Sequence, residues 1–146
     1  MYKRQIETYY TTYPKLRLYI SEQIDFAREN GYVTTVLGRR RYLRDINSQN
    51  AIIRGAAERN AVNAPIQGSA ADIIKLAMIA IQKRLSNEKL QSKMLLQVHD
   101  ELVFDVPISE LDEIKKIVKY EMENAFTLNV PLVVDIGIGN NWLEAH

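Results

Sequence analysis

Three side chains that could do chemistry stand in a row at His99, Asp100 and Glu101. They separate two short apolar stretches, so we predict two strands, at about 93–99 and 102–106, joined by a tight turn at Asp100-Glu101. Two-residue turns prefer a glycine, because a positive φ is costly for other residues. Adjacent carboxylates also repel each other, so this turn carries two costs that need an explanation.

A divalent cation bound at Asp100 and Glu101 would account for both costs. Mg²⁺ takes hard oxygen ligands and keeps waters and substrate phosphates in its remaining positions. The spacing alone also fits an ordinary polar turn in solvent, so two hypotheses stay open at this point.

The densest basic patch comprises Arg39, Arg40 and Arg41, with Arg44 close by. Guanidinium groups suit phosphate contacts, which position a nucleic acid without specifying its sequence. An exposed arm with several arginines could also face only solvent. We expect one or two of these arginines, rather than all of them, to contact a polyanion.

The charges are unevenly distributed along the chain. Residues 31–99 carry eleven Lys or Arg against four Asp or Glu, whereas residues 100–146 carry three against ten. A basic half beside an acidic half can indicate a polyanion site next to a metal site, although solvated faces give the same pattern.

Cysteine is absent from the chain, which excludes disulfides and thiolate metal sites and favours the cytoplasm. No basic-then-apolar leader opens the sequence, and no apolar run approaches the roughly 20 residues of a membrane span. We therefore predict no membrane association.

Two elements are predicted in the first third of the chain. Pro14 suits the first turn of a helix and Gly31 its C-terminal cap, so this segment is predicted to be helical. Residues 31–43, GYVTTVLGRRRYL, favour a small hairpin with Gly38 at the turn.

A second helix is predicted from about Asn50 to Val62. Pro65 should break or kink it, because proline lacks the N–H and clashes with the preceding turn. Ser69, followed three residues later by an aspartate, resembles a capping box that restarts a helix running to about Leu85.

Beyond the two central strands, an amphipathic helix is predicted from about Ser109, and residues 132–138 alternate like a third strand. Widely separated strands with helices between them indicate an α+β fold with antiparallel pairing.

Several motifs together resemble those of the family A DNA polymerases, of the bacterial DNA polymerase I type. The matching segments, in the order and spacing of the family, are GYVTTVLGRRRYL, AAERNAVNAPIQGSAADIIKLAM, QVHDELV and VDIGIGNNWLEA. A lone His-Asp-Glu is a weak signal, but this constellation covers the chain from about Tyr9 onward and is highly specific.

The resemblance implies template-directed DNA synthesis, in which two Mg²⁺ ions clamp the attacking and leaving oxygens at a primer 3′-hydroxyl. It makes Asp100 a direct metal ligand and Glu101 an auxiliary carboxylate beside it. His99 would face the primer terminus.

The resemblance also implies that Arg59, Asn63 and Gln67 face the minor groove of primer-template DNA. Donors there can test base-pair geometry without reading sequence, because every correct pair offers similar acceptors. From the residues alone, Asn63 could simply end a helix before Pro65, and Gln67 could be part of a loop.

Two parts of the family's catalytic machinery are missing from this sequence. One is an earlier aspartate that provides the other metal-binding carboxylate, and the other is a helix whose Arg, Lys and Tyr handle the incoming dNTP. The resemblance therefore implies that residues 1–146 are the C-terminal part of a right-hand polymerase domain. Its antiparallel palm sheet would have flanking helices, and its partners would include the N-terminal part of the same chain.

Two other functions compete with DNA synthesis. A single-subunit, phage-type RNA polymerase also begins its palm motif with His-Asp, but the next residue there is typically Ser rather than Glu101. A non-catalytic DNA-binding module could retain a polymerase fold, although the intact pair Asp100-Glu101 argues against lost catalysis.

Overall fold

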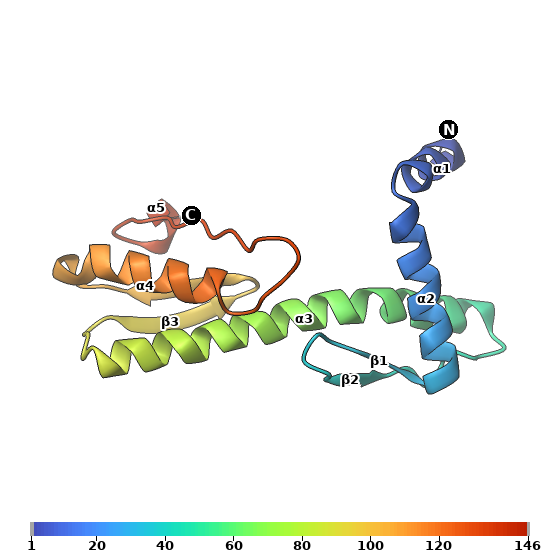
Figure 1. The fold of residues 1–146 in the computed structure, drawn as a ribbon, viewed down its shortest axis with the longest axis horizontal. Coiled ribbons are helices and arrows are strands. Elements are labelled where there is room, and N and C mark those ends of the chain that lie inside the picture. The colour runs from blue at the N-terminus through green and yellow to red at the C-terminus, as the bar shows by residue number, and fades with distance from the viewer. Residues whose placement is uncertain (1, 146) are drawn as a thin grey trace. The chain divides into compact units, whose positions relative to one another are not determined.

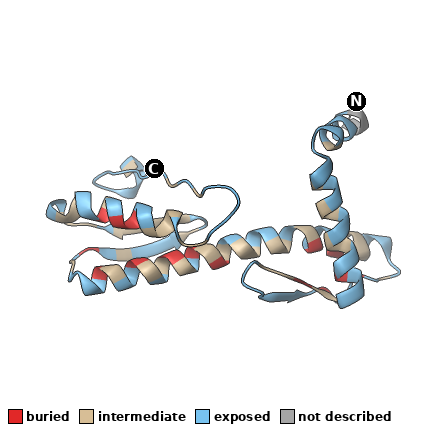
Figure 2. Ribbon diagram, in the orientation of Figure 1, coloured by how far each residue is buried: buried red, intermediate tan, exposed pale blue. Residues whose placement is uncertain are grey.

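The computed structural model describes the backbone of residues 2–145 and the side chains of residues 5–145. They divide into two compact units, one up to Ser69 and the other from Ala70 onward. Figure 1 labels elements of both units where there is room, and Figure 2 shows that each unit has buried residues of its own.

The first unit begins with helices α1 (Tyr2–Thr12) and α2 (Pro14–Asn30). Pro14 occupies the start of α2, where its missing N–H removes no helical hydrogen bond. Gly31 ends the helix at φ 76°, and its N–H donates to the Ala27 carbonyl at 2.8 Å. Both predicted boundaries of this helix are confirmed.

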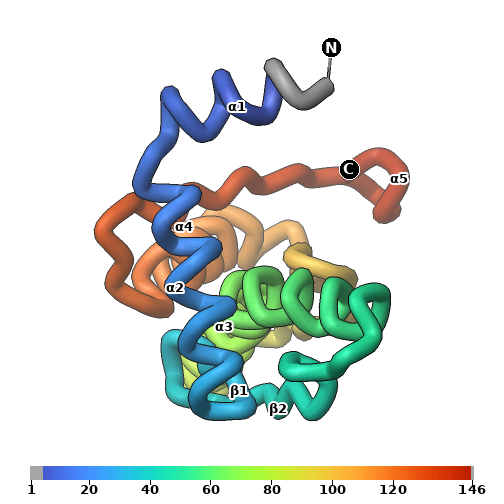
Figure 3. Tube along the Cα trace, turned by 90° about the vertical axis from the view of Figure 1, so that its right-hand side faces the viewer, coloured from blue at the N-terminus to red at the C-terminus, as the bar shows by residue number. Residues whose placement is uncertain are grey.

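A small antiparallel hairpin follows, with strands β1 (Tyr32–Thr34) and β2 (Arg40–Tyr42). Figure 3 follows the chain from α2 through this hairpin into α3. Gly38 has φ 78°, which supplies the left-handed turn residue that the sequence indicated. The predicted hairpin is therefore confirmed.

Helix α3 runs without interruption from Ala51 to Asn87, with Pro65 inside it. The predicted break and the restart at Ser69 are wrong. The Ser69 hydroxyl does not begin a helix but donates to the carbonyl of Pro65 at 2.5 Å. Packing keeps the helix continuous, because residues just before the proline belong to the core of the first unit. That core comprises Ala27, Val33, Leu43, Ile46, Ala57 and Ala61, with Ile24 and Ala64 packed against it.

The same helix qualifies as a membrane span by length and composition, since an 18-residue window reaches a mean hydropathy of 1.3. The sequence prediction that no segment approaches such a span is therefore corrected. Core helices of soluble proteins pass the same test. Asn63, Gln67 and Lys75 interrupt its apolar residues, so the helix alone is weak support for a membrane location.

The second unit contains the antiparallel strands β3 (Lys93–Val98) and β4 (Glu101–Asp105). A short 3-10 turn, η1 (Ile108–Glu110), precedes α4 (Leu111–Glu123), and α5 (Trp142–Ala145) lies near the end of the chain. Two antiparallel hairpins among helices confirm the predicted α+β class.

One face of the β3–β4 hairpin packs on helices α3 and α4. The buried cluster there comprises Ile81, Leu85, Ile114 and Val118, with Leu90, Met94, Leu102, Phe104, Val106 and Met122 against it. The hydrophobic periodicity of α4 predicted this packing.

The third predicted strand is wrong for this structure, because residues 131–139 form no strand among the described residues. Alternating apolar residues form a strand only when a neighbouring strand takes up their hydrogen bonds. The described sheets pair β1 with β2 and β3 with β4, so no described strand pairs with residues 131–139.

Candidate functional site

The turn between β3 and β4 consists of His99 and Asp100, one residue earlier than predicted. Val98 pairs with Glu101, so Glu101 is the first residue of β4 and not part of the turn. His99 has φ 54°, a left-handed conformation that glycine normally provides at the first position of such turns. The apolar residues predicted both strands, but they did not specify which residues pair across the turn.

This strained turn has a local hydrogen bond that holds it. The side-chain amide of Gln97 donates to the His99 carbonyl at 3.0 Å. The apolar face of the hairpin is anchored by Leu102 and Phe104, which pack against the core of the second unit. A left-handed non-glycine residue costs of order 1–3 kcal/mol and persists only where its surroundings hold it.

The turn and the first residue of β4 present two carboxylates with different surroundings. Asp100 is exposed on the turn, whereas Glu101 is half-buried at the start of β4. Within the described residues, no group of three His, Asp or Glu side chains is arranged to hold a metal ion. The oxygen donors match what Mg²⁺ prefers, and one or two carboxylates plus substrate phosphates commonly suffice for it. The chain thus supplies part of a Mg²⁺ site by donor type.

Arg59, Asn63 and Gln67 form an exposed row on α3. Their spacing of four residues places them on one side of a helix, but only while the helix remains continuous. The passage of α3 through Pro65 therefore brings together three residues that the predicted break would have separated.

The three arginines of the hairpin have different surroundings. Arg39 donates from its guanidinium to the Gly68 carbonyl at 3.1 Å. The guanidinium of Arg40 lies over the Tyr32 ring, 4.5 Å from its centroid. Arg41 is exposed, and among residues 5–145 its side chain makes no hydrogen bond, ion pair or ring contact. Arg41 is the arginine of this set best placed to meet a phosphate.

Residues 2–144 match the sequence profile of DNA polymerase family A. The chain belongs to this family. It is 53% identical over 139 residues to DNA polymerase I of Caldicellulosiruptor bescii, covering 95% of this chain and 16% of that protein. It is 54% identical over 140 residues to DNA polymerase I of Mycobacterium leprae, covering 96% of this chain and 15% of that protein.

A solved family A structure shares the fold closely. The POL domain of Pol1 from M. smegmatis, in complex with DNA primer-template and dNTP, matches with a TM-score of 0.96 and 50% identity. The match covers 98% of this chain and 25% of that one. Against the full-length relatives the chain is short, since it spans 16% of the length of the C. bescii polymerase.

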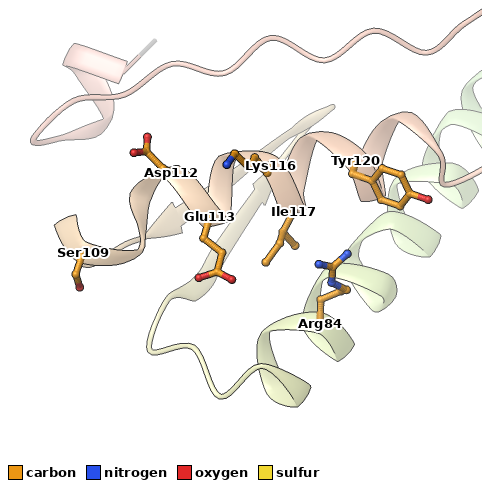
Figure 4. Close-up of a pocket in the computed structure, with 7 residues that line it drawn as sticks. All are labelled: Arg84, Ser109, Asp112, Glu113, Lys116, Ile117 and Tyr120. Atoms are coloured by element: carbon orange, nitrogen blue, oxygen red, sulfur yellow. The ribbon is translucent and has the colours of Figure 1, made fainter.

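A surface groove of about 590 Å³ lies elsewhere on this family A chain (Figure 4). Figure 4 shows Arg84 on α3 pointing toward α4 near Ile117 and Tyr120, with Ser109 of η1 at the other end of the groove. Arg84 forms ion pairs with Glu88 at 2.7 Å and Glu121 at 3.3 Å. The pKa of Arg84 is raised, and the main cause is its hydrogen bond to Glu88. None of the sequence-predicted site residues lines this groove, so we assign it no catalytic role.

Sequence reasoning missed two polar contacts of this family A chain. Gln97 was part of the quoted motif but received no role, although a polar residue two positions before a turn is a usable signal. Gly68, in the middle of α3, was treated as part of the motif only. An isolated glycine inside a helix often marks a close approach by another segment, and here that segment is the β1–β2 turn.

Proposed function

We propose that the chain is part of a DNA-directed DNA polymerase that extends a primer 3′-hydroxyl with nucleotides from dNTPs on a template strand. One observation carries the proposal. The chain places His99 and Asp100 on a tight turn beside Glu101, and it is 50% identical to a polymerase domain in complex with primer-template DNA and dNTP.

Asp100 and Glu101 are the residues that would hold Mg²⁺, with Asp100 as the direct ligand. When bound, two such ions stabilise the attacking and leaving oxygens of nucleotidyl transfer. The chain's own task is to hold the carboxylates in place, which the packed hairpin and the Gln97 amide support. His99, on the same turn, would lie at the primer terminus.

The exposed row of Arg59, Asn63 and Gln67 is proposed to face the minor groove of primer-template DNA. Purine N3 and pyrimidine O2 accept hydrogen bonds at similar positions in every correct pair. Donors on a rigid helix can therefore test base-pair geometry without sequence preference. Arg41, and to a lesser extent Arg39 and Arg40, would contact phosphates and position the duplex.

The partners that follow are primer-template DNA, the dNTPs, and the remaining part of the polymerase, with the cytoplasm as the proposed location. We propose residues 1–146 as the C-terminal part of the catalytic domain. The family match favours DNA synthesis over the RNA polymerase hypothesis, and no observation favours a non-catalytic module.

The test replaces Asp100 with Ala in the complete polymerase. We expect single-turnover incorporation in Mg²⁺ to be abolished while binding of primer-template DNA is largely retained, since metal-held charge stabilises the transition state more than the ground state. Asp105→Ala is the matched control, because Asp105 is an exposed aspartate at the far end of β4, away from the turn. Near-normal incorporation by Asp100→Ala would refute the metal assignment.

A further inference from the structure

The turn of the β1–β2 hairpin is fastened to α3 directly after Pro65. The backbone N–H of Val36 donates to the Ser69 hydroxyl at 2.9 Å. The Arg39 guanidinium donates to the Gly68 carbonyl at 3.1 Å, and the Ser69 hydroxyl itself donates to the Pro65 carbonyl at 2.5 Å. Three hydrogen bonds thus converge on one turn of the helix.

This turn is where α3 most needs outside support. Pro65 has no N–H, so the carbonyl four residues earlier loses its helical partner, and the proline ring crowds it. A proline inside a helix usually bends or breaks it. The contacts from the hairpin fall on Gly68 and Ser69, three and four residues beyond the proline.

Gly68 allows the hairpin to come this close. A methyl carbon at Gly68 would lie 2.6 Å from the Cγ2 atom of Thr35, far inside van der Waals contact. The next nearest atom, on the Arg39 guanidinium, would lie 3.6 Å away, which is an ordinary contact. The backbone φ of Gly68 is not in the left-handed region, so backbone conformation does not require a glycine here. The close approach of the Thr35 methyl group does.

Gln67 is the neighbour of Gly68, and it ends the row that is proposed to face DNA. We propose that the β1–β2 hairpin braces α3 at this point, and that Gly68 and Arg39 are positioning residues for Gln67. They set how well the polymerase discriminates a matched from a mismatched primer end. This inference rests on the proposed function and deepens it. It also gives Arg39 a second role, which acts through the helix and comes in addition to the phosphate contact proposed above.

The physical reason is the sensitivity of a positioned donor to small displacements. A misplacement of about 1 Å, even one caused by a remote change, can cost roughly 100-fold in rate. Moving the hairpin off Gly68 would shift the helical turn that carries Gln67. The effect should appear in discrimination at the primer end, because that is where a misplaced minor-groove donor would fail.

The experiment introduces Gly68→Ala into the complete polymerase, alone and combined with Thr35→Ser. The serine lacks Cγ2 but retains the hydroxyl that accepts from the Arg39 backbone N–H at 3.2 Å. Alanine is also the better helix former, so a loss in Gly68→Ala cannot come from helix propensity. Extension from matched and mismatched primers is measured for each variant, together with thermal unfolding.

We expect Gly68→Ala to lower the matched-to-mismatched ratio by about 10-fold or more, within the range for a displaced catalytic group. The double variant should return to the ratio of Thr35→Ser alone. Adding Gly68→Ala to Gln67→Ala should change the ratio little further, because two changes that act through one group are not additive.

Three results would overturn the inference. One is a double variant as impaired as Gly68→Ala. Another is a normal ratio in Gly68→Ala, with only thermal stability reduced, since that would show a purely structural glycine. The third is full additivity of Gly68→Ala with Gln67→Ala. If Gln67→Ala itself leaves the ratio unchanged, the minor-groove assignment under the proposed function fails first.

Discussion

The side-chain amide of Gln97 donates a hydrogen bond to the main-chain carbonyl of His99 at 3.0 Å. This bond joins the end of β3 to the residue whose backbone is left-handed, at φ 54°. It therefore ties a strand residue to the turn that carries Asp100, the proposed metal ligand.

We expect Gln97→Ala in the complete polymerase to lower the incorporation rate by roughly fivefold, because a hydrogen bond of this type contributes about 1 kcal/mol. Binding of primer-template DNA should change much less. Single-turnover incorporation and equilibrium DNA binding measure the two effects separately. Gln91→Ala, a glutamine in the loop before β3, is the control, and equal losses in both variants would contradict the role of Gln97.

Glu101→Ala should reduce incorporation less than Asp100→Ala does. Glu101 is half-buried and begins β4, whereas Asp100 is exposed on the turn where a metal can approach. Incorporation rates measured across a series of Mg²⁺ concentrations compare the two variants. If Glu101→Ala proves the more damaging change, the direct ligand has been assigned to the wrong carboxylate.

Gln67→Ala should weaken extension and reduce discrimination at the primer end without creating sequence preference. A well-formed minor-groove hydrogen bond is worth about 1–3 kcal/mol, or roughly 5- to 150-fold. Steady-state extension from matched and mismatched primers of several sequences is the measurement. Lys75→Ala, farther along the same helix, provides a control. A loss confined to some primer sequences would argue against the proposed contact.

Glu110 should make the stability of the second unit depend on pH. Its carboxylate accepts hydrogen bonds from the backbone N–H of Gln91, and from the N–H and hydroxyl of Ser92, and these lower its pKa. A carboxyl group whose folded-state pKa is depressed stabilises the fold above its unfolded pKa, and this contribution is lost as pH falls through the folded pKa.

Glu110→Gln should therefore lower the unfolding temperature of the chain at pH 7, and its difference from wild type should shrink as the medium becomes acidic enough to protonate Glu110. Thermal unfolding at a series of pH values from 7 downward measures this. If the unfolding temperatures of Glu110→Gln and wild type differ by the same amount at every pH, the charge of the Glu110 carboxylate does not stabilise the second unit.

The 146-residue chain by itself should not extend primers, and it should bind DNA weakly and in a salt-sensitive way. Asp100 and Glu101 would supply only part of a two-metal site, and Mg²⁺ gives up its waters reluctantly. Phosphate contacts by the hairpin arginines would remain, and they weaken as salt rises. Primer extension and DNA titrations at two salt concentrations form the test. Extension that depends on Asp100 would show that the site is complete without further motifs.

Local signals in the sequence were sufficient where the structure depends on local geometry. Pro14 and Gly31 marked the bounds of α2, and Gly38 marked the hairpin turn. The sequence also predicted α4 as an amphipathic helix, and its apolar residues Ile114 and Val118 lie in the core.

The same signals failed where distant contacts decide the outcome. Pro65 does not end α3, because the core of the first unit packs on the residues before it and the hairpin supports the turn after it. Residues 131–139 have the pattern of a strand, but a pattern cannot provide the neighbouring strand. The turn at His99 was misplaced by one residue, since its strain is held by Gln97 and not by a favourable residue type.

The candidate site shows the same contrast between local sequence signals, which could be predicted, and distant contacts, which could not. The sequence named His99, Asp100, Glu101 and the row on α3, and the structure places the first two on the turn and the row on one helix side. Their catalytic and DNA-binding roles stay predictions. Gly68 could not be assigned from the sequence, because its role depends on the Thr35 methyl group 33 positions earlier.

The two-residue connection between β3 and β4 also bears on the order in which the polymerase folds. Every residue pair of this hairpin lies no farther apart in the chain than Lys93 and Asp105. Hairpins this local form in about 1–10 μs, whereas pairing with a distant segment is slower because a long loop must first close. Pulse-labelled hydrogen exchange at residues 94–104 would time the event. We expect the turn that carries Asp100 to acquire its shape early and from its own sequence, so that later-arriving strands dock onto carboxylates that are already in place.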